Sequence, residues 1–172
     1  MPELESVKVN IKLPFIGTIE GTWKPNEDEK NAAWELYIEL ITRISVAELD
    51  SEEGLLREAL SSLYSLFEIT REILKTYGTS VAKPKGENPI SFGYLSVAIL
   101  NTVIRPVLAK WHPLLLDHES KKPKNISTVA HEKEWESYKE LRQVLNTTRL
   151  ILIQYANLLA QVADVPNLII DR

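Results

Sequence analysis

The residues best suited to chemistry are an arginine and a histidine in the stretch Arg105-Pro-Val-Leu-Ala-Lys-Trp-His112. Arg105 is the first charged residue after a long uncharged run, and His112 follows seven positions later. On a helix this spacing is two turns, so both side chains would lie on one face, roughly 10 Å apart along the axis. An arginine can neutralise a phosphate and a histidine can move a proton, and these are the minimal parts of metal-free RNA cleavage by the 2′-hydroxyl.

The same stretch resembles the motif of the HEPN-type ribonucleases, a helical-bundle family in which a histidine follows an arginine after four to six residues. The resemblance implies a dimer in which two motifs face each other, with Arg105 steering phosphate and His112 acting as acid or base. Segment 100–116 also resembles a pattern of uncharacterised bacterial helical proteins, and that likeness extends from Trp34 to the C-terminus. It implies no named activity, and an accessory role in a bacterial signalling or defence system is a hypothesis only.

A structural role accounts for the same residues, and we favour it. Arg105 could pair with Glu68 or Glu72 of the preceding helix, and His112 with Trp111 could close a helix end above Pro113. We therefore expect no catalytic residue and no cofactor. If the stretch binds anything, the candidate residues are Arg105, Lys110, Trp111 and His112. A metal site formed by His112, Asp117, His118 and Glu119 is a weaker interpretation than a solvated helix end, so we expect no metal.

Composition excludes several classes of protein. The 172 residues fit one domain, and the absence of cysteine rules out disulfides and thiolate chemistry and agrees with a cytoplasmic protein. A net charge of −4 argues against broad affinity for nucleic acid or anionic membranes. We expect neither a signal sequence nor a membrane segment, because residues 1–14 contain no apolar core and the uncharged run 88–104 is short and interrupted by polar residues.

Alternating hydropathy predicts an N-terminal β ribbon, residues 1–24. Val7, Val9, Ile11 and Leu13 share one face of a strand, and residues 16–23 with two glycines form the returning strand. A lone ribbon is marginally stable in water, so it must lie on the helices or pair with another chain.

Residues 25–172 predict four helices packed as an antiparallel four-helix bundle, so the fold is mainly α and the chain is one domain overall. Asn26 caps a first helix that reaches about Val46. A capping box of Asp50 and Glu53 opens a second helix that stops at Gly78. The third helix, residues 90–108, is apolar almost all round and should be the buried centre, kinked or ended by Pro106 and Pro113. The fourth begins near Thr128 and carries a heptad seam: Tyr138, Leu141, Leu145, Thr148, Leu152, Tyr155, Leu159 and Val162.

Leu150 and Ile153 fall on the outward face of this last helix and need cover from the ribbon, the tail or another subunit. Together with the open ribbon edge, they favour a non-enzymatic helical protein that acts through a protein partner or as a homodimer. Two alternatives remain open. One is a HEPN-like metal-independent endoribonuclease using Arg105 and His112, for which RNA would be the substrate. The other is a sensor that binds a small ligand in a pocket near Pro106 and Pro113.

Overall fold

The structure is a computed structural model that describes residues 3–43, 46, 50 and 52–169. It is mainly helical, with an antiparallel two-stranded hairpin at the N-terminus, as the sequence predicts. The elements are β1 Val7–Leu13, β2 Gly17–Trp23, α1 Glu27–Ile41, α2 Leu56–Tyr77, a 3₁₀ turn Gly78–Val81, α3 Phe92–Ile99, a π-helical segment Leu100–Ile104, α4 Arg105–Ser120, α5 Thr128–Glu134 and α6 Tyr138–Val162.

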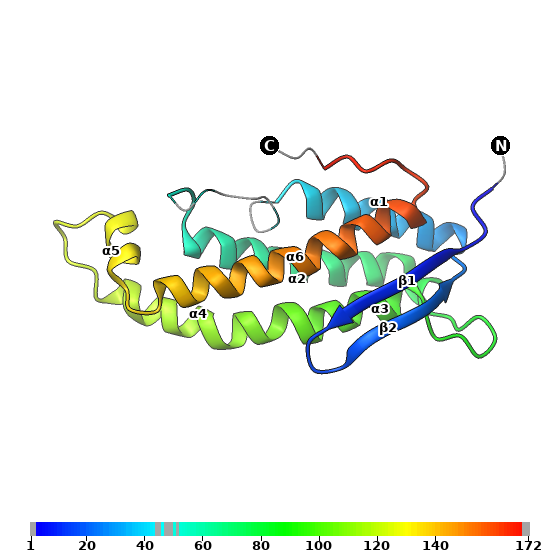
Figure 1. The fold of residues 1–172 in the computed structure, drawn as a ribbon, viewed down its shortest axis with the longest axis horizontal. Helices are drawn as coiled ribbons and strands as arrows, with labels where there is room; N and C mark the ends of the chain where they lie inside the picture. Colours follow the sequence, from blue (N-terminus) through cyan, green and yellow to red (C-terminus); the bar gives the residue numbers. More distant parts are fainter. Residues whose placement is uncertain (1–2, 44–45, 47–49, 51, 170–172) are drawn as a thin grey trace.

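The long helices lie lengthwise beside one another (Figure 1). α1 and the rod made by α3, the π segment and α4 run one way, whereas α2 and α6 run back. α6 packs on α1 and on β1, and α2 packs on α1 and α4. The hairpin lies along one end of this body, and α5 lies at the opposite end (Figure 1).

The hairpin rests on the helices through the face that the alternation predicts. Val7, Val9, Ile11 and Leu13 are all buried, and the register pairs Val7 with Trp23 and Leu13 with Gly17. On β2, Gly21 lets the side chain of Ile90 approach closely, because a Cβ there would lie 2.7 Å from the Ile90 Cδ1 atom. The hairpin is therefore held against both α6 and the segment that leads into α3.

Helix α1 begins where the sequence predicts and ends earlier. Asn26 is the N-cap, and its side chain and that of Glu29 form a reciprocal capping box. The helix ends at Ile41 with Thr42 as its C-cap, not near Val46. Val46 is nevertheless buried in the turn that follows, so its apolar position in the pattern reflects burial and not helix. Residues 44–45 and 47–49 lie outside the described residues.

The capping box predicted for the second helix is wrong. α2 starts at Leu56, after a turn in which Glu53 accepts a hydrogen bond from the Asp50 amide. The free amides at its start are instead satisfied by the carboxylate of Glu132 on α5, which accepts from Leu56 N at 2.8 Å and Arg57 N at 3.2 Å. At the other end Gly78, with φ +67°, is the predicted C-cap.

The third predicted helix is longer than expected and is not buried all round. It continues from Phe92 through Pro106 and Pro113 to Ser120. The π segment shifts the hydrogen-bond spacing just before Pro106, which has no N–H to donate. By length and composition this rod could span a bilayer, with a mean hydropathy of 1.5 in its most apolar window, and half of that window is buried inside the molecule.

The fourth predicted helix is two helices. α5 ends at Glu134, Trp135 adopts an extended conformation, and α6 starts at Tyr138. The heptad seam is confirmed as the inner face of α6, since Leu141, Thr148, Leu152, Tyr155, Leu159 and Val162 are all buried. Within it the hydroxyl of Tyr155 lies 2.6 Å from that of Ser96, which joins α6 to α3.

A fully buried carboxylate, Glu29, holds the hairpin end of the molecule together. One oxygen accepts from the Trp23 indole N–H at 2.5 Å and from the Phe92 amide at 3.0 Å. The other accepts from the Asn26 amide and from the ammonium group of Lys85. Glu29 thereby fixes β2, the start of α1, the 82–89 loop and the start of α3 to one another.

Replacing Glu29 by glutamine should lower the free energy of unfolding by about 3 kcal/mol, because an amide nitrogen would then face donors that now share a carboxylate oxygen. Chemical denaturation followed by circular dichroism measures this loss. Glu27→Gln is the matched control, since Glu27 lies exposed in the same first turn of α1 and its replacement should change stability by less than about 0.5 kcal/mol. Equal stability of the two variants would show that Glu29 does not hold this junction.

Candidate functional site

Arg105 and His112 line the same surface groove, on the side of α4 that faces α2. The groove has a volume of about 330 Å³. Its walls come from α2 and α4: Tyr64, Phe67, Arg105, Leu108, Ala109, His112 and Pro113. The two-turn spacing in the sequence thus puts both side chains on one accessible face.

Arg105 is exposed and makes no ion pair with Glu68 or Glu72 among the described residues, so that predicted pairing is not found. Its Nε donates to Asn101 Oδ1 at 3.1 Å, and its guanidinium carbon lies 5.1 Å from the centre of the Phe67 ring. The charge is therefore oriented by a neutral partner and an aromatic face, and no carboxylate of the described residues pairs with it.

His112 is held by an arginine from α2. Its Nδ1 lies 2.9 Å from Arg57 Nη1, and the Arg57 guanidinium is fixed by both carboxylate oxygens of Glu119. Because a guanidinium can only donate, Nδ1 accepts, and the ring proton of the neutral imidazole lies on Nε2. Nε2 has no partner among the described hydrogen bonds, and the exposed ring can offer this N–H to a ligand in the groove.

The other two predicted binding residues do not reach this groove. Trp111 is only 3% exposed and packs edge-on against Trp135, so it belongs to the core. Lys110 is exposed on the side of α4 nearer α6, where its ammonium nitrogen lies 3.8 Å from Glu140. Consecutive helix positions point in different directions. Of the four predicted binding residues, Arg105 and His112 therefore line the groove, whereas Lys110 and Trp111 do not.

A pair of stacked histidines, which no sequence pattern indicated, closes α5 onto α4. The rings of His118 and His131 lie 3.8 Å apart and nearly parallel. Each Nε2 reaches the backbone carbonyl of the other residue, at 2.6 and 2.7 Å. His118 is thus occupied within this clasp, Asp117 pairs with Lys121, and Glu119 pairs with Arg57. In the described part of the chain no three potential metal ligands converge.

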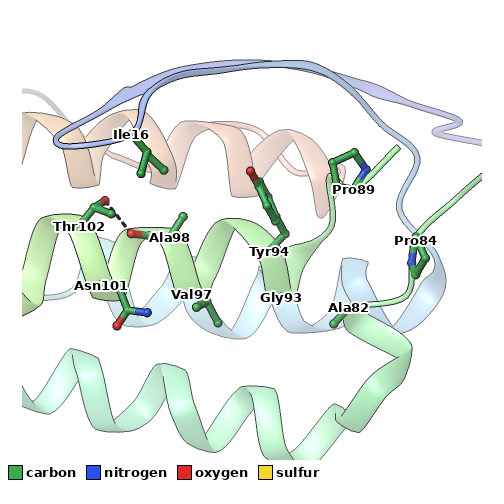
Figure 2. A pocket seen from close by; sticks show the side chains of 10 residues that line it. All are labelled: Ile16, Ala82, Pro84, Pro89, Gly93, Tyr94, Val97, Ala98, Asn101 and Thr102. Carbon is green, nitrogen blue, oxygen red and sulfur yellow. Dashed lines mark hydrogen bonds between the residues drawn. The ribbon is translucent and has the colours of Figure 1, made fainter. Parts of the chain in front are cut away.

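A second and larger groove lies beside the hairpin (Figure 2). Its volume is about 600 Å³, and none of its lining residues is charged: Ile16, Ala82, Pro84, Pro89, Gly93, Tyr94, Val97, Ala98, Asn101 and Thr102. Figure 2 shows that the Ile16 side chain points from the hairpin toward α3 and that Tyr94 lies between Ile16 and Pro89. This groove was not predicted from the sequence, because Ile16 of the hairpin lies far in the chain from the 82–89 loop and α3, which form the other sides.

A third groove, of about 340 Å³, lies on the other side of the hairpin turn. Phe15 and Pro106 line it together with residues of α6 such as Val144 and Thr148. Pro106 and Pro113 therefore each border a groove of the size that the small-ligand hypothesis requires, although they border different ones.

Leu150 and Ile153, the predicted interface residues, differ in exposure. Leu150 is 48% exposed on α6, whereas Ile153 is partly covered and packs against the core. Part of the predicted apolar surface is thus covered within the chain, and part of it remains open.

Comparison with known proteins gives no relative. No family model, no curated protein and no solved structure matches this chain.

Diethyl pyrocarbonate, which acylates accessible neutral imidazole rings, should modify His112 several times faster than the other two histidines. The reason is that the His112 ring is exposed, whereas His131 is buried, His118 is half-buried and the two stacked rings cover each other. Peptide mass spectrometry measures the three rates. His112→Ala should remove the fast phase alone, and equally fast modification of His118 would contradict the clasp.

Proposed function

We propose that the chain is a cytoplasmic, non-enzymatic module, built as an antiparallel four-helix bundle with its hairpin, that acts by associating with a second copy of itself. The alternating directions of α1, α2, the α3–α4 rod and α6 support the bundle. The observation that carries the self-association is the pair of exposed apolar side chains at the hairpin turn, Phe15 and Ile16.

The composition of the surface at the hairpin turn favours association. Ile16 is 51% exposed and lines the groove that has no charged lining residue, and its neighbour Phe15, 83% exposed, lines the third groove. Clustered apolar side chains at a surface mark interaction sites, whereas scattered ones do not. A second copy is a suitable partner because an uncharged patch brings no like charges together, even though each chain carries a net charge of −4.

Sedimentation velocity should show the mass rising toward twice the chain mass of 19.6 kDa as the concentration increases through the micromolar range. The association should persist at high salt, because apolar contacts are not screened by ions. A mass of one chain at every concentration, in both low and high salt, would contradict the proposal.

A metal-independent endoribonuclease is the second candidate, and one observation favours it. Arg105 and His112 line one open groove, with an unneutralised guanidinium at one end and an imidazole N–H at the other. Tyr64 and Phe67 supply aromatic surface between α2 and α4 on which a base could stack. These groups could bind a phosphate and move a proton without a metal ion.

If this second candidate is right, the wild-type chain should cleave single-stranded RNA in the presence of EDTA, and His112→Ala should lower the rate by about 100-fold or more. Lys110→Ala is the matched control, because Lys110 is a neighbouring exposed cation outside the groove and its loss should leave the rate unchanged. Cleavage no faster with the wild-type chain than with His112→Ala would exclude this activity.

A further inference from the structure

We propose that the groove between α2 and α4 binds a small aromatic carboxylate, with Arg105 at the charged end of the ligand and His112 at its other end. The groove is the one of about 330 Å³ that both residues line. This inference concerns a different surface from the proposed self-association and goes beyond it. The site would be the same in one copy of the chain as in two.

The groove carries a positive charge that the described residues leave without a counter-ion. The chain has 24 acidic residues against 20 basic ones, yet none of the described residues that line the groove is acidic. Arg105 donates from Nε to Asn101 Oδ1, and its two terminal nitrogens have no partner among the described hydrogen bonds. Two parallel N–H groups of a guanidinium match the two oxygens of a carboxylate. The free end of Arg105 is therefore a site for one carboxylate.

The histidine at the other end of the groove is held as a second donor. Glu119 accepts from Arg57 Nε at 3.0 Å, and Arg57 Nη1 lies 2.9 Å from Nδ1 of His112. Because the guanidinium donates to the ring's only lone pair, Nε2 presents an N–H to the groove and the ring presents no acceptor. Arg105 and His112 thus both donate, which selects a ligand that accepts hydrogen bonds at both ends.

The surface between the two donors is apolar and partly aromatic. Tyr64 and Phe67 lie one turn apart on α2, and Leu108 and Ala109 line the same groove from α4. The two donors are two helical turns apart, roughly 10 Å along the axis, so a ligand with one ring and a short substituent at each end can reach both. A volume of about 330 Å³ also lies at the lower end of the range of roughly 300–1,000 Å³ for small-molecule sites. The groove therefore suits a single-ring ligand.

The lining favours a carboxylate over a phosphate or a nucleic acid. Arg105 is the one Lys or Arg among the described lining residues, because Lys110 lies nearer α6 and the charge of Arg57 is paired with Glu119. Phosphate sites commonly add the free N–H groups of a helix N-terminus, and polyanions need several cations along a groove. Here the walls are interior turns of α2 and of the α3–α4 rod, where backbone N–H groups bond within the helix. One positive charge matches one carboxylate.

Binding of para-acetylhydrocinnamate tests this assignment, because the compound carries a carboxylate and a carbonyl oxygen at opposite ends of one ring. In a heteronuclear NMR titration of the full chain, the amides of α2 and α4 beside the groove should shift, with a Kd of about 1 mM or below. The corresponding primary amide has nearly the same shape and no charge. It should bind at least about tenfold more weakly, because it cannot form the charged pair with Arg105.

Three variants locate the binding energy. Arg105→Gln should weaken binding of the carboxylate by about tenfold or more and leave binding of the amide nearly unchanged, since only the carboxylate uses the positive charge. His112→Phe keeps an aromatic ring but removes the N–H, so it should weaken both compounds several-fold. Lys110→Gln is the matched control, because it removes an exposed positive charge of α4 outside the groove and should bind like the wild type. All three positions are exposed, and circular dichroism checks that each variant folds.

Equal binding of the carboxylate and the amide, or an equal loss of binding in Lys110→Gln, would overturn the pairing of an anion with Arg105. Inorganic phosphate or a short single-stranded RNA that displaces the carboxylate at lower concentration would overturn the carboxylate and assign the groove to a phosphate group. The absence of shifts beside the groove at about 10 mM carboxylate would exclude the site. None of these outcomes depends on the mass found by sedimentation, so the site and the self-association fail separately.

Discussion

The arrangement of the molecule depends on the buried carboxylate of Glu29. A carboxylate removed from water must have its lone pairs satisfied, and Glu29 satisfies them with donors from four separate segments. Trp23 donates from the hairpin, Lys85 from the 82–89 loop and the Phe92 amide from the start of α3, so all three segments are bonded to Glu29. The three sides of the apolar groove are therefore fixed by one side chain that is not itself part of the groove. A change in that junction would move the hairpin tip relative to α3.

The opposite end of the molecule is held in a comparable way by charged groups from different elements. Glu132 of α5 caps the start of α2, and Arg57 of α2 donates hydrogen bonds to both carboxylate oxygens of Glu119 on α4. The stacked His118 and His131 close α5 onto α4. Between the two ends the core is mostly apolar, and its buried polar groups are paired: Thr70 and Thr148 donate to backbone carbonyls of their own helices. Tyr155 is bonded to Ser96, and complete burial raises the pKa of the tyrosine. The grooves lie on the outside of this frame, which leaves them open without weakening the core.

The sequence predicted the features that depend on neighbouring residues. Alternation placed Val7, Val9, Ile11 and Leu13 on the inner face of the hairpin, Asn26 marked the start of α1, and the heptad spacing identified the inner face of α6. The predicted cap of the second helix was wrong, because a residue distant in the chain caps this helix in place of a local one. Glu53 had the spacing of a capping residue, but Glu132, 76 positions beyond Leu56, caps the helix. Similarly, proline was expected to bend or end the third helix, whereas a π segment lets it continue.

The candidate site divides along the same line. Arg105 and His112 share a face because helical spacing dictates it, so their common face was predicted, whereas the groove that both line was found only in the structure. Their partners Phe67 and Arg57 come from α2, and the sequence did not predict these contacts. The apolar groove beside the hairpin was not predicted, because it forms where the hairpin meets the 82–89 loop and α3, and the contacts that join them, such as those of Glu29 with Trp23 and Phe92, link residues far apart in the chain.

Hydrogen–deuterium exchange of the unmodified chain, compared between dilute and concentrated solutions, tests the central claim most directly. If the hairpin turn and the α3 groove form the contact between copies, amides at residues 15–17 and in the 82–89 loop should exchange more slowly in the concentrated sample, and those of α5 should not change. Slower exchange confined to α6 around Leu150, or no difference between the two samples, would contradict the account.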